Sequence, residues 1–482
     1  MSSPEKPVAL FVFGAFRKQS GGLSRAWYQR LIAFHNEGWE IHLALCSYRR
    51  YRRTTLEQVL GGPLPEGITI HKFWDEPMNK VQRGISYGTA AAGLAVRKAL
   101  RKPVKKLVTE DRGAEIREWS YDRFGRLLLE LDRNKETEQP IRRTWFDIGG
   151  NWVIKEWLGV DEEDPLSVQL SRDPAPRPIA KARAEWLASL GLPPGTVAMG
   201  DSPYFYPVIA ELPDTFGRIY VFHLQHLTYG EDAMGALTKR MAAFFDPNAY
   251  GADSVAVSTV EQANDLRTRY GQDYPVDFVH PVVRKVQGDP SIARDSKRVV
   301  SVGRIVDIKR IHLTVDAMAL VVKQVPDAYL EIWGSGIEAE FVQEHIEKTG
   351  MSKHVRMMGY TPNPEKVFRG AACSVLTSRR EAFGLVVIES MMQGCPVVGF
   401  DVKYGPSGII KSGVNGYLVK DKDLQGIADG IISILTNPDL AKSMSVEAEK
   451  TNKVIDHDQY QDEWNELGLK VRKIALDRST KN

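Results

Sequence analysis

The chain has 482 residues, which at roughly 100–200 residues per domain corresponds to two large domains or about three smaller units. Apolar residues make up 43% and charged residues 26%, a balance that argues against disordered, fibrous and disulfide-stapled proteins. Sixty-four Lys and Arg against 61 Asp and Glu give a net charge of +3, which argues against a general nucleic-acid binder. Any strongly basic surface must therefore be confined to one part of the molecule.

The three cysteines, Cys46, Cys373 and Cys395, are widely separated and have no paired spacing. They predict neither a disulfide framework nor a zinc site, and they favour a reducing cytoplasm. The apolar run Val8–Phe13 is too short for a membrane span and lacks the flanks of a signal peptide. We expect a cytoplasmic protein. A peripheral membrane association stays open, because it needs only a surface patch.

The first segment of the chain has an α/β pattern. Val8–Phe13 predicts a strand buried on both faces, as in parallel sheets. A loop with Gly21 and Gly22 follows, and Ser24 is expected to cap the next helix. A second strand is expected over Trp39–Cys46. The order of strand, glycine loop, helix and strand indicates the start of a doubly wound α/β domain.

The pattern changes between residues 107 and 190. Glu115–Tyr121 and Leu127–Asp132 form one extended pair around a turn signal, and Thr144–Ile148 and Trp152–Trp157 form a second. These pairs predict an antiparallel β-meander that is inserted into the first α/β domain.

After the insert the α/β pattern of the first domain resumes, and a second α/β series begins further along the chain. Buried strands are expected at Ile219–Leu224 and Ser254–Val257, and a new α/β series begins at Val299–Val302. The predicted division is 1–106 and 191–285 for an N-terminal Rossmann-like domain, 107–190 for the insert, 297–455 for a C-terminal Rossmann-like domain and 456–482 for a C-terminal helix. Two such domains frame a cleft at the carboxyl ends of their strands.

Two carboxylates in the second domain, Glu381 and Glu389, are separated by seven residues. If a helix begins near Phe383, Glu381 lies in the loop before it and Glu389 lies about two turns inside. The backbone N–H groups of Phe383, Gly384 and Leu385 would then be unpaired and suit a phosphate or sugar oxygen. Taken alone, the motif fits equally well an amphipathic helix with solvated glutamates.

A second motif follows the first strand of this domain. Gly303 and Arg304 are followed by Lys309, and a bidentate Arg with a point-charge Lys can neutralise a diphosphate. The alternative is that both are exposed loop charges. Gly334-Ser-Gly336, at the end of the next strand, is a weak signal by itself.

Together with Gly21-Gly22 and Gly359-Tyr360, these motifs resemble the retaining nucleotide-sugar glycosyltransferases of the GT-B fold. The insert, the segment Asp401–Ser407 and the segment His223–His226 further resemble the branch that glycosylates poly(glycerol or ribitol phosphate) wall teichoic acids. That branch also resembles enzymes that glycosylate serine-rich bacterial surface proteins. The resemblance covers both α/β domains and implies an N-terminal acceptor domain and a C-terminal nucleotide-sugar donor domain.

The resemblance implies that Arg304 and Lys309 hold the donor diphosphate, while Glu381 and Glu389 bind hydroxyls of the transferred sugar and of the ribose. Fixed cations can offset the charge on a departing nucleotide, so neither a metal nor a cofactor is expected, and the UDP-sugar is a cosubstrate. The implied donor-binding positions on the surrounding loops are Gly21, Gly22, Gly359, Tyr360, Phe383, Gly384 and Leu385.

A histidine beside the reacting sugar is also implied. His226 is the better match to the family position and His223 the second. A satisfied core or capping histidine is the alternative for either residue. Retention would proceed by front-face attack or through a short-lived covalent intermediate, which the sequence does not separate.

The implied reaction moves a hexose or N-acetylhexosamine from UDP-glucose or UDP-N-acetylglucosamine to a hydroxyl of a teichoic acid. The same chemistry on Ser or Thr of a surface protein, or on another glycan or lipid carrier, is the alternative. A non-catalytic sugar-binding subunit is a third interpretation. No nucleic-acid partner is expected.

Basic runs at 97–106 and 49–53 are either solvated faces or tracks for a polyanionic acceptor or for anionic lipid at the inner membrane face. The aromatic residues of the insert are expected to form its core. If they are exposed, they would suit protein association, and the family resemblance suggests self-assembly into a homo-oligomer through this insert.

Overall fold

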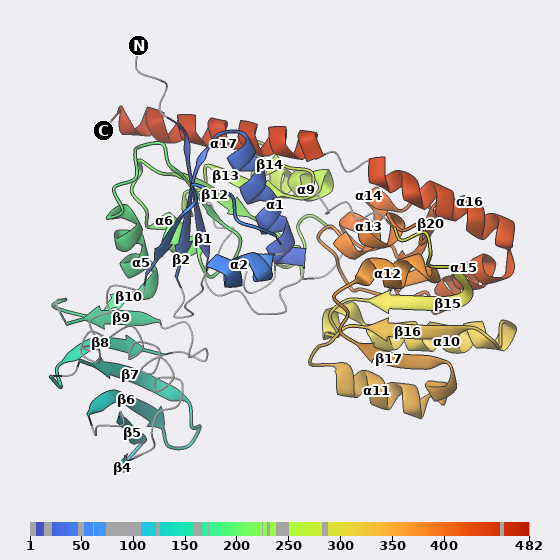
Figure 1. The fold of residues 1–482 in the computed structure, drawn as a ribbon, viewed down its shortest axis with the longest axis horizontal. Helices are drawn as coiled ribbons and strands as arrows, with labels where there is room; N and C mark the ends of the chain where they lie inside the picture. The colour runs from blue at the N-terminus through green and yellow to red at the C-terminus, as the bar shows by residue number, and fades with distance from the viewer. Residues whose placement is uncertain are drawn as a thin grey trace.

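The computed structural model describes the following residues: 6–13, 22–46, 53–60, 62–73, 108–121, 126–147, 149–158, 166–171, 173–223, 225–228, 232–237, 250–281, 288–453 and 457–481. Within this part of the chain the strands form three sheets, two parallel and one antiparallel (Figure 1). The prediction of two Rossmann-like domains with an antiparallel insert in the first is confirmed.

The N-terminal sheet has seven parallel strands in the order β14-β13-β12-β11-β1-β2-β3. β1 is central and buried at all six positions, which explains its continuous apolar sequence. The chain reverses its direction of winding between β1 and β11, which are hydrogen-bonded neighbours. The strands are β1 (Val8–Phe13), β2 (Glu40–Leu45), β3 (Thr69–Lys72), β11 (Val197–Gly200), β12 (Gly217–Val221), β13 (Ser254–Val257) and β14 (Val276–Phe278).

Helices cover both faces of this sheet (Figure 1). They are α1 (Gly22–Asn36), α2 (Arg53–Leu60), α5 (Ile179–Ala188), α6 (Tyr206–Ala210) and α9 (Val260–Tyr270). The expectation that Ser24 caps the first helix is wrong, because α1 already begins at Gly22.

The insert is a seven-stranded antiparallel sheet whose strands pair in sequence order from β4 to β10. Charged side chains link neighbouring strands: Asp132 accepts hydrogen bonds from Arg117 (2.5 Å) and Arg142 (2.6 Å). A small apolar cluster that includes Ile154 and Phe73 joins the sheet to the N-terminal domain. The strands are β4 (Val108–Arg112), β5 (Glu115–Tyr121), β6 (Leu127–Asn134), β7 (Pro140–Phe146), β8 (Trp152–Trp157), β9 (Ser167–Leu170) and β10 (Arg177–Pro178).

The C-terminal sheet has six parallel strands in the order β17-β16-β15-β18-β19-β20. They are β15 (Asp295–Val302), β16 (Tyr329–Trp333), β17 (Val355–Gly359), β18 (Ala371–Leu376), β19 (Val397–Phe400) and β20 (Gly416–Val419). The helices of this domain are α10 (Ile311–Gln324), α11 (Ala339–Lys348), α12 (Pro364–Arg369), α13 (Leu385–Met391), α14 (Gly405–Ile409), α15 (Leu424–Thr436) and α16 (Pro438–Glu449).

The last helix, α17 (His457–Ser479), returns from the C-terminal domain and packs along the N-terminal domain (Figure 1). Trp464 and Tyr460 enter the N-terminal core, and the Trp39 indole donates a hydrogen bond of 2.9 Å to Asn465. A Cβ at Gly468 would lie 2.6 Å from the Phe34 ring, so a glycine is needed for this close approach. α17 therefore packs the C-terminal end of the chain against the N-terminal domain.

Among the helices of the described residues, none combines the length and the apolar character that a bilayer crossing requires.

Candidate functional site

The loops that follow β18 and β19 are joined by their backbones. The Glu381 amide donates to the Lys403 carbonyl (3.1 Å), and the Tyr404 amide donates to the Glu381 carbonyl (2.6 Å). These two bonds form a one-residue parallel bridge beyond the ends of the strands. The position of Glu381 is therefore set by main-chain contacts on both sides of its Cα.

The Glu381 carboxylate is held by a cation and a hydroxyl. Lys309 Nζ lies 2.5 Å from Glu381 Oε1, and Ser378 Oγ donates to the same oxygen at 2.6 Å. Both ionised side chains are largely buried, which strengthens their attraction relative to a surface pair. The structure thus brings together two of the residues that the sequence singled out.

The loop that carries Lys309 is fixed by Arg310, whose side chain is buried. The Arg310 guanidinium donates to the carbonyls of Thr377 (2.9 Å) and Ser378 (2.8 Å), and it forms an ion pair with Asp421. The β15 loop is thereby bound to the start of the Glu381 loop. Arg310, which no motif of the sequence singled out, holds the two loops together, and the ion pair between Arg379 and Asp307 joins them at a second point.

Glycines allow the loop after β15 to meet two further loops, those at the carboxyl ends of β16 and β17. A Cβ at Gly334 would lie 1.7 Å from the Gly303 carbonyl oxygen, and one at Gly336 would lie 1.9 Å from that of Ile305. The Gly334 amide donates to the Gly359 carbonyl at 2.8 Å. Gly334 and Gly336, which were a weak signal in the sequence, thus lie where two backbones approach closely.

Beside these glycines, Arg304 is exposed and Tyr360 is 57% exposed. Both lie in the loops that follow the ends of strands, where ligands of parallel sheets bind. Arg304 and Tyr360 are therefore accessible, whereas Lys309 is engaged with Glu381.

The expected helix start near Phe383 is wrong. α13 begins at Leu385, because Gly384 at its N-terminus adopts a left-handed φ of 83°, which glycine allows and which is not helical. Glu389 is therefore about one turn inside the helix instead of two. Phe383 packs tightly against the neighbouring loop, since a Cβ at Gly405 would lie 1.7 Å from the Phe383 carbonyl oxygen.

Residues after β19 also contact the N-terminal domain. The Tyr404 hydroxyl donates to Asp265 of α9 at 2.9 Å, and Lys403 Nζ lies 2.8 Å from the same carboxylate. Arg380, next to Glu381, donates to the Leu227 carbonyl at 2.9 Å. The loops that hold Glu381 are thus also contacts between the two domains.

His226 lies against Tyr404. The two rings are stacked with centroids 5.7 Å apart, and the side chain of His226 is fully buried. Burial lowers the pKa of His226 to about 4, because the interior disfavours the charged imidazolium more than the nearby Asp265 favours it. His226 is therefore a neutral group at physiological pH.

His223 has a different environment. Its Nε2 lies 2.6 Å from Asp201 Oδ1, and Asp201 is also paired with Arg30 of α1. The His223 side chain is 21% exposed, in contrast to the enclosed His226. Both histidines follow β12, but only His223 keeps accessible surface.

Several residues of the site were not found from the sequence. Asp201 directly follows a buried strand, so its position at a strand end was a usable signal. Tyr404 lies in the segment 401–407, which entered only as part of a resemblance. Asp265 lies within a helix and gave no local signal, because its importance comes from a contact with the other domain.

Some predicted residues lie outside the described part of the chain. These are Gly21, residues 97–106, Arg49, Arg50 and Arg52. Gly22 is described as the first residue of α1.

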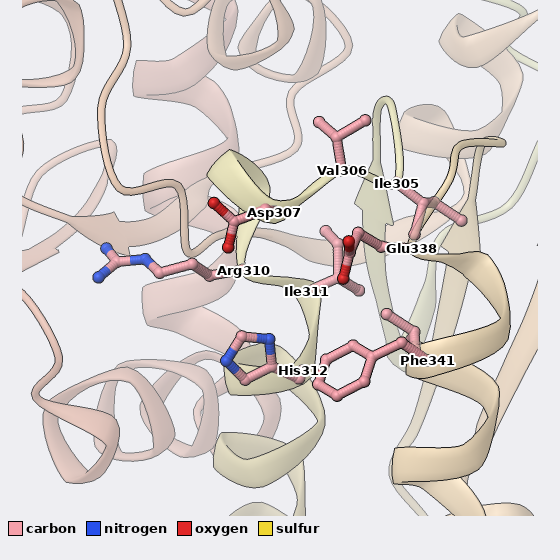
Figure 2. Close-up of a pocket in the computed structure, with 9 residues that line it drawn as sticks. Ile305, Val306, Asp307, Arg310, Ile311, His312, Glu338 and Phe341 are labelled. Atoms are coloured by element: carbon pink, nitrogen blue, oxygen red, sulfur yellow. The ribbon is translucent and has the colours of Figure 1, made fainter. Parts of the chain in front are cut away.

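A cavity of about 130 Å³ lies between the beginnings of α10 and α11 (Figure 2). Its lining includes Ile305, Ile311, His312, Glu338 and Phe341. Neither Lys309 nor Glu381 lines it. Asp307 and Arg310 do line it, so the cavity lies on another side of the loop that carries Lys309. In the described residues, no group of three or more His, Cys, Asp or Glu side chains is arranged to hold a metal ion.

Comparison with known proteins gives the same fold and a related sequence. Residues 284–451 match the family model of group 1 glycosyl transferases. Over 218 residues the chain is 31% identical to the poly(glycerol-phosphate) α-glucosyltransferase of Bacillus subtilis (strain 168), covering 45% of this chain and 32% of that protein. Over 249 residues it is 30% identical to the poly(ribitol-phosphate) α-N-acetylglucosaminyltransferase of Staphylococcus aureus (strain COL), covering 52% and 49%. The aligned regions span about half or less of these relatives.

Solved structures extend the likeness to the whole chain. TarM of S. aureus, solved with UDP, α-GlcNAc-glycerol and fondaparinux, matches with a TM-score of 0.75 and 18% identity over 96% of this chain and 99% of that one. The pneumococcal O-GlcNAc transferase GtfA, solved with UDP and GlcNAc, matches with a TM-score of 0.71 and 16% identity over 97% and 99%. At these identities the likeness shows the fold, and the predicted GT-B fold is confirmed.

The buried position of His226 leads to a pH prediction. We expect its imidazole to titrate near pH 4, whereas an ordinary histidine titrates near about 6.5. The unfolded chain then binds this proton below about 6.5 but the folded protein binds it only near 4, so the free energy of unfolding falls as the pH drops through that window. NMR titration of isotope-labelled histidines, assigned with His226→Gln, measures this directly. Titration near 6.5 would contradict the described packing against Tyr404.

Proposed function

We propose that this chain, a GT-B protein related to the group 1 glycosyltransferases, transfers a hexose or N-acetylhexosamine from a UDP-sugar to a hydroxyl of a polyol-phosphate polymer. The contact between Lys309 and Glu381, at the edge where the loops after β15 and β18 meet, is the observation that carries the proposal. A fixed cation and a hydrogen-bonding carboxylate at this edge suit the diphosphate and the sugar hydroxyls of such a donor.

In the proposed reaction, an acceptor hydroxyl oxygen forms a bond to the anomeric carbon of the sugar. The bond from that carbon to the β-phosphate oxygen breaks, and UDP leaves with the bonding electrons. The acceptor proton passes to the departing phosphate on the same face, so the configuration is retained. Arg304 and Lys309 offset the charge that develops on the phosphate, with no step that requires a metal.

The two glutamates have separate proposed roles. Glu381, positioned by Lys309 and Ser378, accepts hydrogen bonds from hydroxyls of the transferred sugar. Glu389, one turn inside α13, accepts hydrogen bonds from the ribose. We propose that Gly359-Tyr360 and Phe383-Gly384-Leu385 complete the donor site, together with Gly21 and Gly22 of the N-terminal domain.

We propose His223, rather than His226, as the histidine that contacts substrate. His226 is fully buried behind Tyr404, and a substrate could reach it only after that contact opened. His223 is partly exposed at the carboxyl end of the N-terminal sheet. His226 then acts as part of the packing between the domains.

The proposed acceptor rests on the two curated relatives, whose names specify poly(glycerol phosphate) and poly(ribitol phosphate). The pneumococcal relative is named as an O-GlcNAc transferase, so a hydroxyl of a protein is the second candidate.

We also propose that the chain self-associates through the insert. The support for this proposal is that all seven side chains of β5 keep some exposed surface within one chain.

Variants of the paired charges test the donor site. We expect Glu381→Gln to lower the turnover of the UDP-sugar by about 10²–10³-fold, because it removes the charge while keeping the shape. Lys309→Ala should mainly raise the KM for the UDP-sugar and weaken the binding of UDP. The control is Lys297→Ala, which removes an equal charge from a surface contact with Asp327 and should change neither. Unchanged turnover in Glu381→Gln with intact folding would refute its role.

A second experiment identifies the acceptor. UDP-glucose and UDP-N-acetylglucosamine carrying labelled sugars are incubated with poly(glycerol phosphate), poly(ribitol phosphate), a serine-rich peptide and glycerol. We expect labelled polymer, with a rate that falls as NaCl is raised, while transfer to neutral glycerol depends much less on salt. A labelled peptide alone would favour the protein acceptor. Failure of every donor to release UDP would favour a non-catalytic sugar-binding protein.

A further inference from the structure

We propose that Asp201 is a positioning residue that fixes the imidazole of His223, with Nε2–H held by the carboxylate and Nδ1 left as a hydrogen-bond acceptor for a substrate hydroxyl. This inference rests on the proposed function, because it assigns the acceptor side of the same reaction. Asp201 belongs to no motif that was recognised in the sequence.

The two residues meet because of the topology of the N-terminal sheet. Asp201 directly follows β11 and His223 lies two residues beyond β12, and these strands are parallel neighbours. β11 also borders β1, at the point where the winding of the sheet reverses. In open α/β sheets, ligands bind at the carboxyl ends of strands near such a reversal. The pair therefore lies where this fold places ligands.

The contact determines which nitrogen of His223 carries a proton. The distance from His223 Nε2 to Asp201 Oδ1 is 2.6 Å, and an ionised carboxylate can only accept hydrogen bonds. Nε2 must therefore be the donor. In the neutral ring Nδ1 then has a free lone pair, so it accepts a hydrogen bond from a substrate hydroxyl and donates none.

Arg30 keeps Asp201 ionised inside the protein. Burial by itself favours the protonated acid, but the charge of Arg30 and the hydrogen bond from His223 outweigh it and lower the pKa of Asp201. Arg30 is itself buried, and its guanidinium lies 4.7 Å from the ring centroid of Trp464 in α17. The C-terminal helix α17 thus packs on Arg30, and Arg30 in turn pairs with the Asp201 carboxylate.

A comparison with Asp253 separates this role from a purely structural one. Asp253 is also buried beside the same sheet, and both of its oxygens accept hydrogen bonds from Arg478. Asp201 uses Oδ1 for both Arg30 and His223, whereas Oδ2 is buried and has no hydrogen-bond partner among the described residues. A carboxylate that served only the fold would be expected to use both oxygens.

The test removes the carboxylate while avoiding an unpaired buried arginine. Arg30→Met with Asp201→Leu replaces the ion pair by apolar side chains, a change that buried pairs often tolerate. We expect kcat for sugar transfer to fall about a hundredfold, the effect of a misplaced group, while the KM for the UDP-sugar changes less than twofold. The control, Arg478→Met with Asp253→Leu, removes a partly buried pair from the amino end of β13 and should leave kcat unchanged.

A double-mutant cycle distinguishes positioning from loss of structure. If Asp201 acts through His223, then in the His223→Gln background the same pair of substitutions lowers kcat by less than twofold further. A full additional loss, or no loss of kcat in the pair alone, would overturn the inference.

A substrate-free measurement keeps this inference separate from the proposed function. In wild-type protein the Nε2–H proton of His223 should give a slowly exchanging, downfield NMR resonance that disappears in His223→Gln and in the Arg30→Met, Asp201→Leu variant. Absence of that resonance in the wild type overturns the inference whether or not sugar is transferred. Its presence in a protein that turns over no UDP-sugar would support the contact and refute the proposed function.

Discussion

The site depends on one piece of backbone pairing, the two hydrogen bonds between Glu381 and the Lys403–Tyr404 segment. Because these bonds join loops that follow neighbouring strands, they place the Glu381 carboxylate against Lys309 without relying on a flexible side chain for its position. The same pairing orients Tyr404 toward the N-terminal domain, where it contacts Asp265 and stacks on His226. Glycine is required for this arrangement at position 405, since any side chain there would collide with the Phe383 carbonyl.

This pairing links the proposed donor site to the other domain. Tyr404 and Lys403, which pair with Glu381, both contact Asp265. Arg380, the residue before Glu381, donates to the Leu227 carbonyl. On the N-terminal side, Trp464 of α17 packs on Arg30, which in turn pairs with Asp201. Each half of the site is therefore supported by a segment that crosses between the domains. A reaction that must bring a donor and an acceptor together benefits from such preorganisation.

Sequence reasoning was most successful where the signal was local. The apolar run of β1 predicted a buried strand, and the glycine and charge pattern singled out Gly303, Lys309 and Glu381 on loops. The direct contact of Lys309 with Glu381 was not predicted and is seen only in the structure. The start of α13 was misplaced because a left-handed Gly384 ends the loop, a backbone choice that composition alone does not reveal. Contacts such as Arg30 with Asp201, or Tyr404 with Asp265, join residues more than 130 positions apart. They follow from how the domains and the last helix pack, so no local pattern could have predicted them.

The most direct test of this account compares two glycines of α14. A Cβ at Gly405 would lie 1.7 Å from the Phe383 carbonyl oxygen, whereas a Cβ at Gly408 would meet nothing within 4 Å. Release of UDP from the UDP-sugar is measured for Gly405→Ala and Gly408→Ala, with folding checked by circular dichroism. We expect Gly405→Ala to lose about a hundredfold in turnover because the Glu381 loop must shift by an ångström or more, and Gly408→Ala to match the wild type. Wild-type turnover in a folded Gly405→Ala protein would contradict the claim that this backbone pairing positions the site.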